Sequence, residues 1–258
     1  MLKRIKNIYY FRHILFDMAI NQLKAKYAGS RFGIWWAVIV PLLLALSINF
    51  VFQVISKIAI PNYAFFVLSG IMPWLFFTGA LTEVNNSFIA SASILKQSRC
   101  PHEFIPLSLI LANLLNFLIG FIFILPLFMV IKPAILLVVA YLFLIILLET
   151  FFIIGLGLIF ATLNVFFRDL SHFLSIGFTV WFWITPIFYS LDMIDLSYRW
   201  VCFLNPMSYF VSSYQSILFE AKAPLPAALW AMFVIAAVSC LAGYLIFIKN
   251  EPELLKRI

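Results

Sequence analysis

The sequence is poor in charged residues. Aspartate, glutamate, lysine and arginine make up 10% of its 258 residues, whereas hydrophobic residues make up 65%. A soluble domain carries about 25% charged residues, and a chain this poor in them cannot cover a globule of its size with a polar surface. The composition therefore excludes a soluble enzyme and a disordered protein, and it predicts an integral membrane protein.

Charged residues are missing from long stretches that have the length of membrane helices. A helix needs about 20 apolar residues to cross the hydrocarbon core, and the sequence lacks the short alternating segments of an outer-membrane barrel. We therefore predict an all-α integral membrane protein whose single domain has six transmembrane helices. The predicted spans cover residues 33–54, 64–84, 104–130, 134–163, 172–190 and 225–247.

Motifs for catalysis and metal binding are also missing. The three cysteines and three histidines lack the spacing of a disulfide framework or a metal site. None of the nine glycines is followed by lysine, so the chain has no phosphate-binding loop. No HExxH, GxSxG or carboxylate pair appears. We expect no catalytic residue, metal or cofactor in this chain, and a nucleotide can power it only through another subunit.

What the N-terminus does contain is positive charge, because residues 1–31 hold seven lysines and arginines. An apolar stripe with helical spacing runs through them, formed by Phe11, Ile14, Leu15 and Met18. We expect an amphipathic helix on the anionic membrane surface, with a solvated basic arm as the alternative. Lys26 and Arg31 precede the first span, where they can bind bulk anionic lipid or a lipid diphosphate.

The distribution of positive charge predicts the orientation. If both termini are cytoplasmic, the inner segments hold thirteen of the seventeen lysines and arginines, as the positive-inside rule requires. Residues 191–224 then lie outside as short helices that dip into the membrane, and 248–258 form a cytoplasmic tail. A seventh span within 200–219 is the alternative, but it would place the basic C-terminus outside.

Six short motifs follow one another along nearly the whole chain. They are Lys26-Tyr27 with Ser30, Gly33, Trp36 and Pro41; Ser69-Gly70 with Pro73-Trp74; Pro101-His102-Glu103 with Pro106-Leu107-Ser108; Phe167-Arg168-Asp169; Thr185-Pro186-Ile187-Phe188-Tyr189; and Asn205-Pro206-Met207. In this order the chain resembles the membrane subunit of type-2 ABC exporters for polysaccharides, which export O-antigen, capsule and teichoic acid. Tyr214-Gln215 departs from the Tyr-Arg pair expected in that family.

The resemblance implies a homodimer of this chain with two copies of a separate ATPase subunit, which would bind ATP and Mg²⁺. It also implies a lipid-linked glycan as substrate, with O-antigen on undecaprenyl diphosphate as the main expectation, moved outward across the bacterial inner membrane. The alternative is a type-2 ABC permease for a teichoic acid, a capsule, a simple lipid or a drug. Membrane lipids are expected partners, and nucleic acid is not.

Aromatic residues, 18% of the chain, supply candidate contacts for a glycan. Five of them lie at or beyond the outer end of the fifth span: Trp181, Trp183, Tyr189, Tyr209 and Tyr214. A ring with a polar tip suits the apolar face and polar edge of a sugar, while ordinary packing and an interfacial belt are the alternative. Glu149 is the one charged residue inside the fourth span. It makes a structural hydrogen bond, lines a wet path for the glycan, or, as the least favoured alternative, carries a proton.

The resemblance places the ATPase-coupling helix in the cytoplasmic segment 85–103. Its polar residues are Lys96, Gln97, Arg99 and Glu103. A plain basic loop is the alternative. Arg168 and Asp169 follow another inner helix end, where they either join the coupling surface or form a local ion pair.

Overall fold

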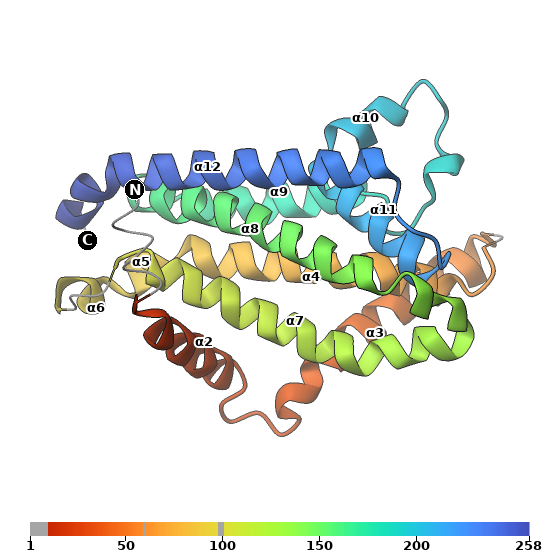
Figure 1. The fold of residues 1–258 in the computed structure, drawn as a ribbon, viewed down its shortest axis with the longest axis horizontal. Coiled ribbons are helices and arrows are strands. Elements are labelled where there is room, and N and C mark those ends of the chain that lie inside the picture. The colour runs from red at the N-terminus through yellow and green to blue at the C-terminus, as the bar shows by residue number, and fades with distance from the viewer. Residues whose placement is uncertain (1–9, 59, 98–100, 258) are drawn as a thin grey trace.

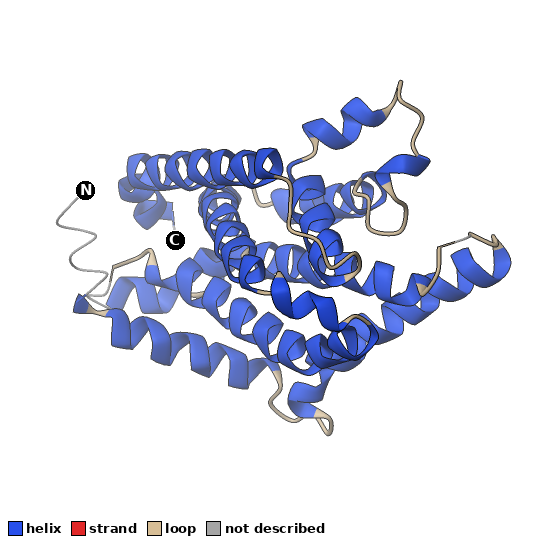
Figure 2. Ribbon diagram, turned by 45° about the vertical axis from the view of Figure 1, so that its right-hand side comes forward, coloured by secondary structure: helices blue, strands red, loops and turns tan. Residues whose placement is uncertain are grey.

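The computed structural model describes residues 10–58, 60–97 and 101–257, and within these ranges the chain is helical with no strand (Figures 1 and 2). The longer helices are α2 (Arg12–Lys26), α3 (Trp36–Asn49), α4 (Tyr63–Asn85), α7 (Phe104–Ile131), α8 (Ala140–Phe166), α9 (Leu170–Ile184), α11 (Pro206–Leu218) and α12 (Pro226–Arg257). The short ones are η1 (Gly33–Trp35), η2 (Phe50–Ile55), α5 (Ser87–Ala90), α6 (Ala92–Gln97), η3 (Pro133–Leu137), η4 (Leu191–Met193) and α10 (Arg199–Leu204).

Five helical segments of the described chain are long and apolar enough to cross a membrane. They are Gly33–Ile55, Tyr63–Asn85, Phe104–Ile131, Ala140–Phe166 and Pro226–Arg257. A shorter apolar helix, Leu170–Ile184, overlaps the predicted fifth span. The prediction of an all-α membrane protein is therefore confirmed.

The helix of the fifth predicted span is shorter than expected. α9 ends at Ile184, because Thr185 takes an extended conformation with φ −83° and ψ 135°, as is favoured for a residue before proline. Its 15 residues cover about 22 Å, less than the roughly 30 Å of a hydrocarbon core. Residues 185–190 instead turn back onto the bundle, where Ile187 is fully buried.

Helix α4 is the centre of the bundle. It packs against α3, α7, α8, α9 and α11, and it is the most buried of the membrane-length helices. The long helices α4, α7, α8 and α12 run along the longest axis of the molecule, with α12 beside α8 (Figure 1). Both faces of α4 are therefore covered by other helices, and each face can line a cavity.

The helices α8 and α12 cross with their backbones in contact. A Cβ atom on Gly155 of α8 would lie 2.2 Å from the carbonyl carbon of Ser239, and one on Gly243 would lie 2.1 Å from the carbonyl oxygen of Gly155. The Ser239 hydroxyl donates a hydrogen bond to the carbonyl of Phe152 at 3.0 Å. Small residues allow the two backbones to approach closely. Such close van der Waals packing holds helices together in lipid, where the hydrophobic effect does not.

The N-terminal helix α2 packs against α7. Ala19 is fully buried, and Leu15 and Met18 of the predicted apolar stripe are partly buried. Ile14 of the same stripe is exposed. Contact with α7 therefore covers part of the predicted stripe, and the position of α2 on the membrane surface stays a prediction.

Replacing Gly155 with alanine should destabilise the protein by about 1–3 kcal/mol, because the new methyl group overlaps the backbone of Ser239 and forces the two helices apart. The matched control is Gly177→Ala on α9, where an added Cβ atom has nothing within 4 Å. We expect the melting temperature in detergent to fall by several degrees for Gly155→Ala only. Equal melting temperatures for the two variants would contradict the close crossing.

Candidate functional site

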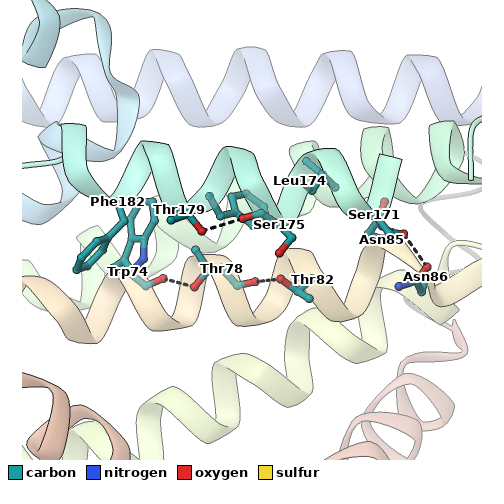
Figure 3. Close-up of a pocket in the computed structure, with 11 residues that line it drawn as sticks. Trp74, Thr78, Thr82, Asn85, Asn86, Ser171, Leu174, Ser175, Thr179 and Phe182 are labelled. Atoms are coloured by element: carbon teal, nitrogen blue, oxygen red, sulfur yellow. Dashed lines mark hydrogen bonds between the residues drawn. The ribbon is translucent and has the colours of Figure 1, made fainter. Parts of the chain in front are cut away.

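A polar groove with a cavity volume of about 340 Å³ runs between α4 and α9 (Figure 3). Hydroxyl side chains four residues apart line both of its walls. We call them the hydroxyl row: Thr78 and Thr82 on α4, with Ser171, Ser175 and Thr179 on α9. Trp74 and Phe182 lie at one end of the groove, and Asn85 and Asn86 lie at the other (Figure 3).

The threonines of the hydroxyl row use their protons within their own helices. Thr78 donates to the carbonyl of Trp74 at 2.9 Å, and Thr82 donates to that of Thr78 at 2.7 Å. Across the groove, Thr179 donates to the carbonyl of Ser175 at 3.0 Å. A hydroxyl oxygen retains lone pairs after donating, so the groove offers hydrogen-bond acceptors to a ligand that carries hydroxyl groups.

The amide end of the groove, next to α5, is crossed by a network of four polar side chains. Asn85 donates to the hydroxyl of Ser171 at 2.8 Å. Asn164 of α8 donates to the side-chain oxygen of Asn86 at 2.9 Å. The Ser171 hydroxyl lies 3.1 Å from that oxygen and 3.2 Å from the side-chain oxygen of Asn164. This amide network ties the end of α4 to α8 and α9.

The predicted aromatic residues divide into groups. Trp181 packs edge-on against Trp74 and donates its indole N–H to Asn205 at 2.6 Å. Trp183 is 56% exposed, and its ring packs edge-on against Phe188. Trp181 therefore packs behind the wall of the groove. Trp183 has an exposed ring near the end of the groove that Trp74 and Phe182 form.

The three tyrosines are less closely grouped than the sequence suggested. Tyr189 also contacts Phe188, and its hydroxyl donates to the carbonyl of Ile184 at 2.7 Å. Tyr209 lines a different, mainly apolar cavity between α8, α11 and α12. Tyr214 is completely buried. The structure thus brings Tyr189 together with the tryptophans but places Tyr209 and Tyr214 elsewhere.

Glu149 and Tyr214 form a pair in the packed interior. Both side chains are 0% exposed, and the Tyr214 hydroxyl donates to Oε2 of Glu149 at 2.8 Å. The rings of Phe117 and Phe121 pack edge-on against Tyr214, and neither member of the pair lines the groove. This burial favours the structural hydrogen bond over contact with a glycan.

Gln215, where the polysaccharide exporters are expected to have arginine, holds α11 to the turn after α9. Its side-chain NH₂ group donates to the carbonyls of Pro186 at 2.9 Å and Ile187 at 3.3 Å. A neutral amide can make these bonds without bringing a charge into the interior.

Lys26 takes part in an ion pair that the sequence analysis missed. Its ammonium lies 2.8 Å from Oε1 of Glu83 and 3.0 Å from the side-chain oxygen of Asn113. Glu83 lies at the end of the predicted second span. Burial and the charge of Glu83 raise the pKa of the neighbouring Tyr27 phenol. Arg31 is exposed.

A family model for ABC-2 type transporters matches residues 16–219. The chain belongs to the ABC-2 type transporter family. It is 34% identical over 225 residues to an O-antigen export system permease protein RfbA of Klebsiella pneumoniae, covering 84% of each chain. It is 31% identical over 269 residues to a protein of the same name from Myxococcus xanthus, covering 100% of each. The family resemblance inferred from the motifs is confirmed.

In this ABC-2 transporter chain, the predicted coupling segment is braced by the C-terminal end of α12. Phe88 of α5 stacks on Phe247 with ring centroids 5.7 Å apart. His102 lies 2.8 Å from Oε1 of Glu251, and the guanidinium of Arg257 lies over the ring of Phe166 at 4.7 Å. The predicted tail 248–258 is thus helical as far as Arg257.

The structure describes the side chains of some of the predicted coupling residues but not of others. Glu103 is buried and directly precedes α7, while Arg168 and Asp169 are exposed. The side chains of Lys96 and Gln97 and the whole of Arg99 lie outside the described part of the chain. Within the described ranges, no group of three histidine, cysteine or acidic side chains is arranged to hold a metal ion.

Glu149→Leu should destabilise the protein by about 1–3 kcal/mol, because it leaves the buried Tyr214 hydroxyl without an acceptor. Glu149→Gln retains an acceptor oxygen and should fold almost normally. Combining Glu149→Leu with Tyr214→Phe removes both polar partners and should restore part of the lost stability. Thermal unfolding in detergent measures all three variants. Additive losses in the double variant would show that the two side chains do not act as a pair.

Proposed function

We propose that this chain is the permease subunit of an ATP-driven exporter that moves a lipid-linked O-antigen polysaccharide outward across the bacterial inner membrane. The observation that carries this proposal is the similarity to O-antigen export permeases over 84–100% of the chain. The family requires an ATPase to drive transport, and we assign ATP and Mg²⁺ to a separate partner chain.

The hydroxyl row supports a glycan as the transported material. Sugars carry many hydroxyl donors and also apolar C–H faces. The groove offers hydroxyl acceptors along its length and the rings of Trp74, Phe178 and Phe182 on its walls. These partners suit both parts of a sugar. Trp183 and Tyr189 extend the aromatic end, and we assign them contact with the glycan as it leaves.

A second copy of this chain would complete the path. Exposed apolar side chains cover a further face of α9, namely Phe173, Ile176, Val180 and Trp183. Because the groove is open rather than enclosed, a single chain forms only one side of a conduit. We propose a homodimer in which α9 borders the seam, so that two grooves face one shared path.

Coupling to the ATPase would act through α5 and α6. With both termini cytoplasmic, these helices lie on the inner side together with Arg168 and Asp169. The amide network begins directly before α5 and reaches α8 and α9. A force on α5 would therefore reach the inner end of the groove through Asn85 and Asn86. Lys96, Gln97, Arg99 and Glu103 are the proposed contacts or supports of this surface.

Removing hydroxyl groups from the groove should reduce export several-fold without loss of assembly. The variant combines Thr78→Val, Ser175→Ala and Thr179→Val, which remove hydroxyls with little change of shape. Thr150→Val is the matched control, because its hydroxyl makes the same bond to the carbonyl four residues earlier but lies outside the groove. Glycan at the cell surface measures export. Normal export by the triple variant would rule out the groove as the glycan path.

Reversing charge at Lys96 and Arg99 together should weaken binding of the ATPase or lower transport-coupled hydrolysis, because the proposed contact surface becomes acidic. The control reverses Lys57 and Lys222, which lie on the proposed outer side. Co-purification and ATP hydrolysis report the two effects, and the chain purified alone should hydrolyse no ATP. Unchanged association, hydrolysis and export in the Lys96 and Arg99 variant would overturn the coupling assignment.

A further inference from the structure

A second cavity, of about 430 Å³, lies on a different face of α4 from the glycan groove. Its walls come from α3, α4, α7, the last residue of α2 and the linker between α2 and α3. The volume falls within the roughly 300–1,000 Å³ of small-molecule sites in proteins. None of its lining residues belongs to the hydroxyl row or to the amide network, so the proposed conduit does not use it.

The polarity of this cavity changes from one end to the other. Its polar side chains, Lys26, Tyr27, Ser30, Asn113 and Asn116, gather where α2 meets the bundle. Farther along, the walls become apolar, with Val40 and Pro41 on α3, Met72 and Leu75 on α4, and Phe117 on α7. α3 and α7 run away from the polar end and α4 runs toward it, so the gradient follows the helix axes. A lipid in the leaflet beside α2 has the same order of headgroup and chain.

The polar end retains donors of hydrogen bonds. An ammonium group has three donors, and the Lys26 ammonium uses two of them for Glu83 and Asn113. The Ser30 hydroxyl oxygen accepts from the indole N–H of Trp36 at 3.1 Å and the backbone N–H of Gly33 at 3.2 Å, which leaves its own proton to donate.

Asn116 adds a further donor to the polar end. Its side-chain oxygen accepts the Tyr27 hydroxyl, so its NH₂ group is left to face a ligand. Three donors at one end of a cavity suit an oxyanion, and charge-assisted bonds to phosphate are strong.

The local charge also favours an anion. Lys24, Lys26 and Arg31 lie in or beside the linker, and the carboxylate of Glu83 pairs with Lys26. The side chains of Lys26 and Glu83 are 33% and 38% exposed, so the pair is open to a headgroup rather than sealed in the core. Basic pockets between membrane helices bind lipid headgroups elsewhere by this chemistry.

We propose that this cavity binds one phosphate-bearing lipid of the leaflet beside α2. The phosphate lies at Lys26, Ser30 and Asn116, and the chain follows Val40, Leu75 and Phe117. A membrane phospholipid and a polyprenyl diphosphate carrier share this chemistry. In either case the lipid joins α2 to α3, α4 and α7, so that it becomes part of the folded subunit.

The test measures lipid retained by the intact transporter, the permease with its ATPase, after delipidation in detergent. Phosphatidylglycerol is added back, and bound lipid is counted by native mass spectrometry. Val40→Phe fills the apolar part of the cavity, and Lys26→Gln removes a phosphate donor. Each should lower retention at least fivefold. The controls are Leu43→Phe, on an exposed part of α3, and Lys24→Gln, on the same turn of α2, because neither residue lines the cavity.

Two further ligands identify the source of the lipid. Diacylglycerol lacks a phosphate and should not be retained. If undecaprenyl diphosphate displaces phosphatidylglycerol at equal concentration, the carrier is the natural ligand. If it does not displace phosphatidylglycerol, the natural ligand is a membrane phospholipid. The proposal would be overturned if the Val40→Phe variant retained as much phosphatidylglycerol as the controls. It would also be overturned if the transporter retained diacylglycerol as well as phosphatidylglycerol. The measurement needs no transport, so its outcome is independent of the glycan assay.

Discussion

A polar group inside the bilayer has no water to bind, so it must find its partner within the protein. This requirement accounts for several of the contacts between helices described above. Glu149 accepts a hydrogen bond from Tyr214 in the packed interior. Asn205 accepts from Trp181 and donates to Thr185 at 2.9 Å. Each of these contacts joins helices that are distant in sequence, so the few polar residues fix the arrangement of a mostly apolar bundle.

Helix α4 carries the two contrasting cavities. The polar groove, the proposed glycan path, meets the face with Thr78 and Thr82, while the second cavity, the proposed lipid site, meets the face with Met72 and Gly79. Because both faces belong to one rigid helix, a shift of α4 changes both cavities at once. The amide network at its end connects this helix to α5, the proposed point of contact with the ATPase.

The sequence predicted the helical membrane fold because charge-free runs of sufficient length leave few alternatives. It also contained the Thr185-Pro186 pair that ends α9, yet apolar composition alone extended that span to residue 190. Gly155 was not distinguishable among nine glycines, since its importance depends on which helix crosses it. Glu83 was missed because the match of a carboxylate with a lysine 57 residues away depends on how α2 packs. The hydroxyl row did have a signal in the sequence, the spacing of four residues on two helices, but the predicted substrate path consisted of aromatic residues and Glu149.

The regular spacing within the hydroxyl row bears on how a long polymer moves. Four residues of α-helix advance about 6 Å, so acceptors recur along the groove at short, nearly equal intervals. A glycan that slides along the proposed path would exchange one weak hydrogen bond for the next, and no position would bind it strongly. Along this proposed path the energy profile is then shallow, which would permit continuous movement and would make transport insensitive to the order of sugars in the repeat.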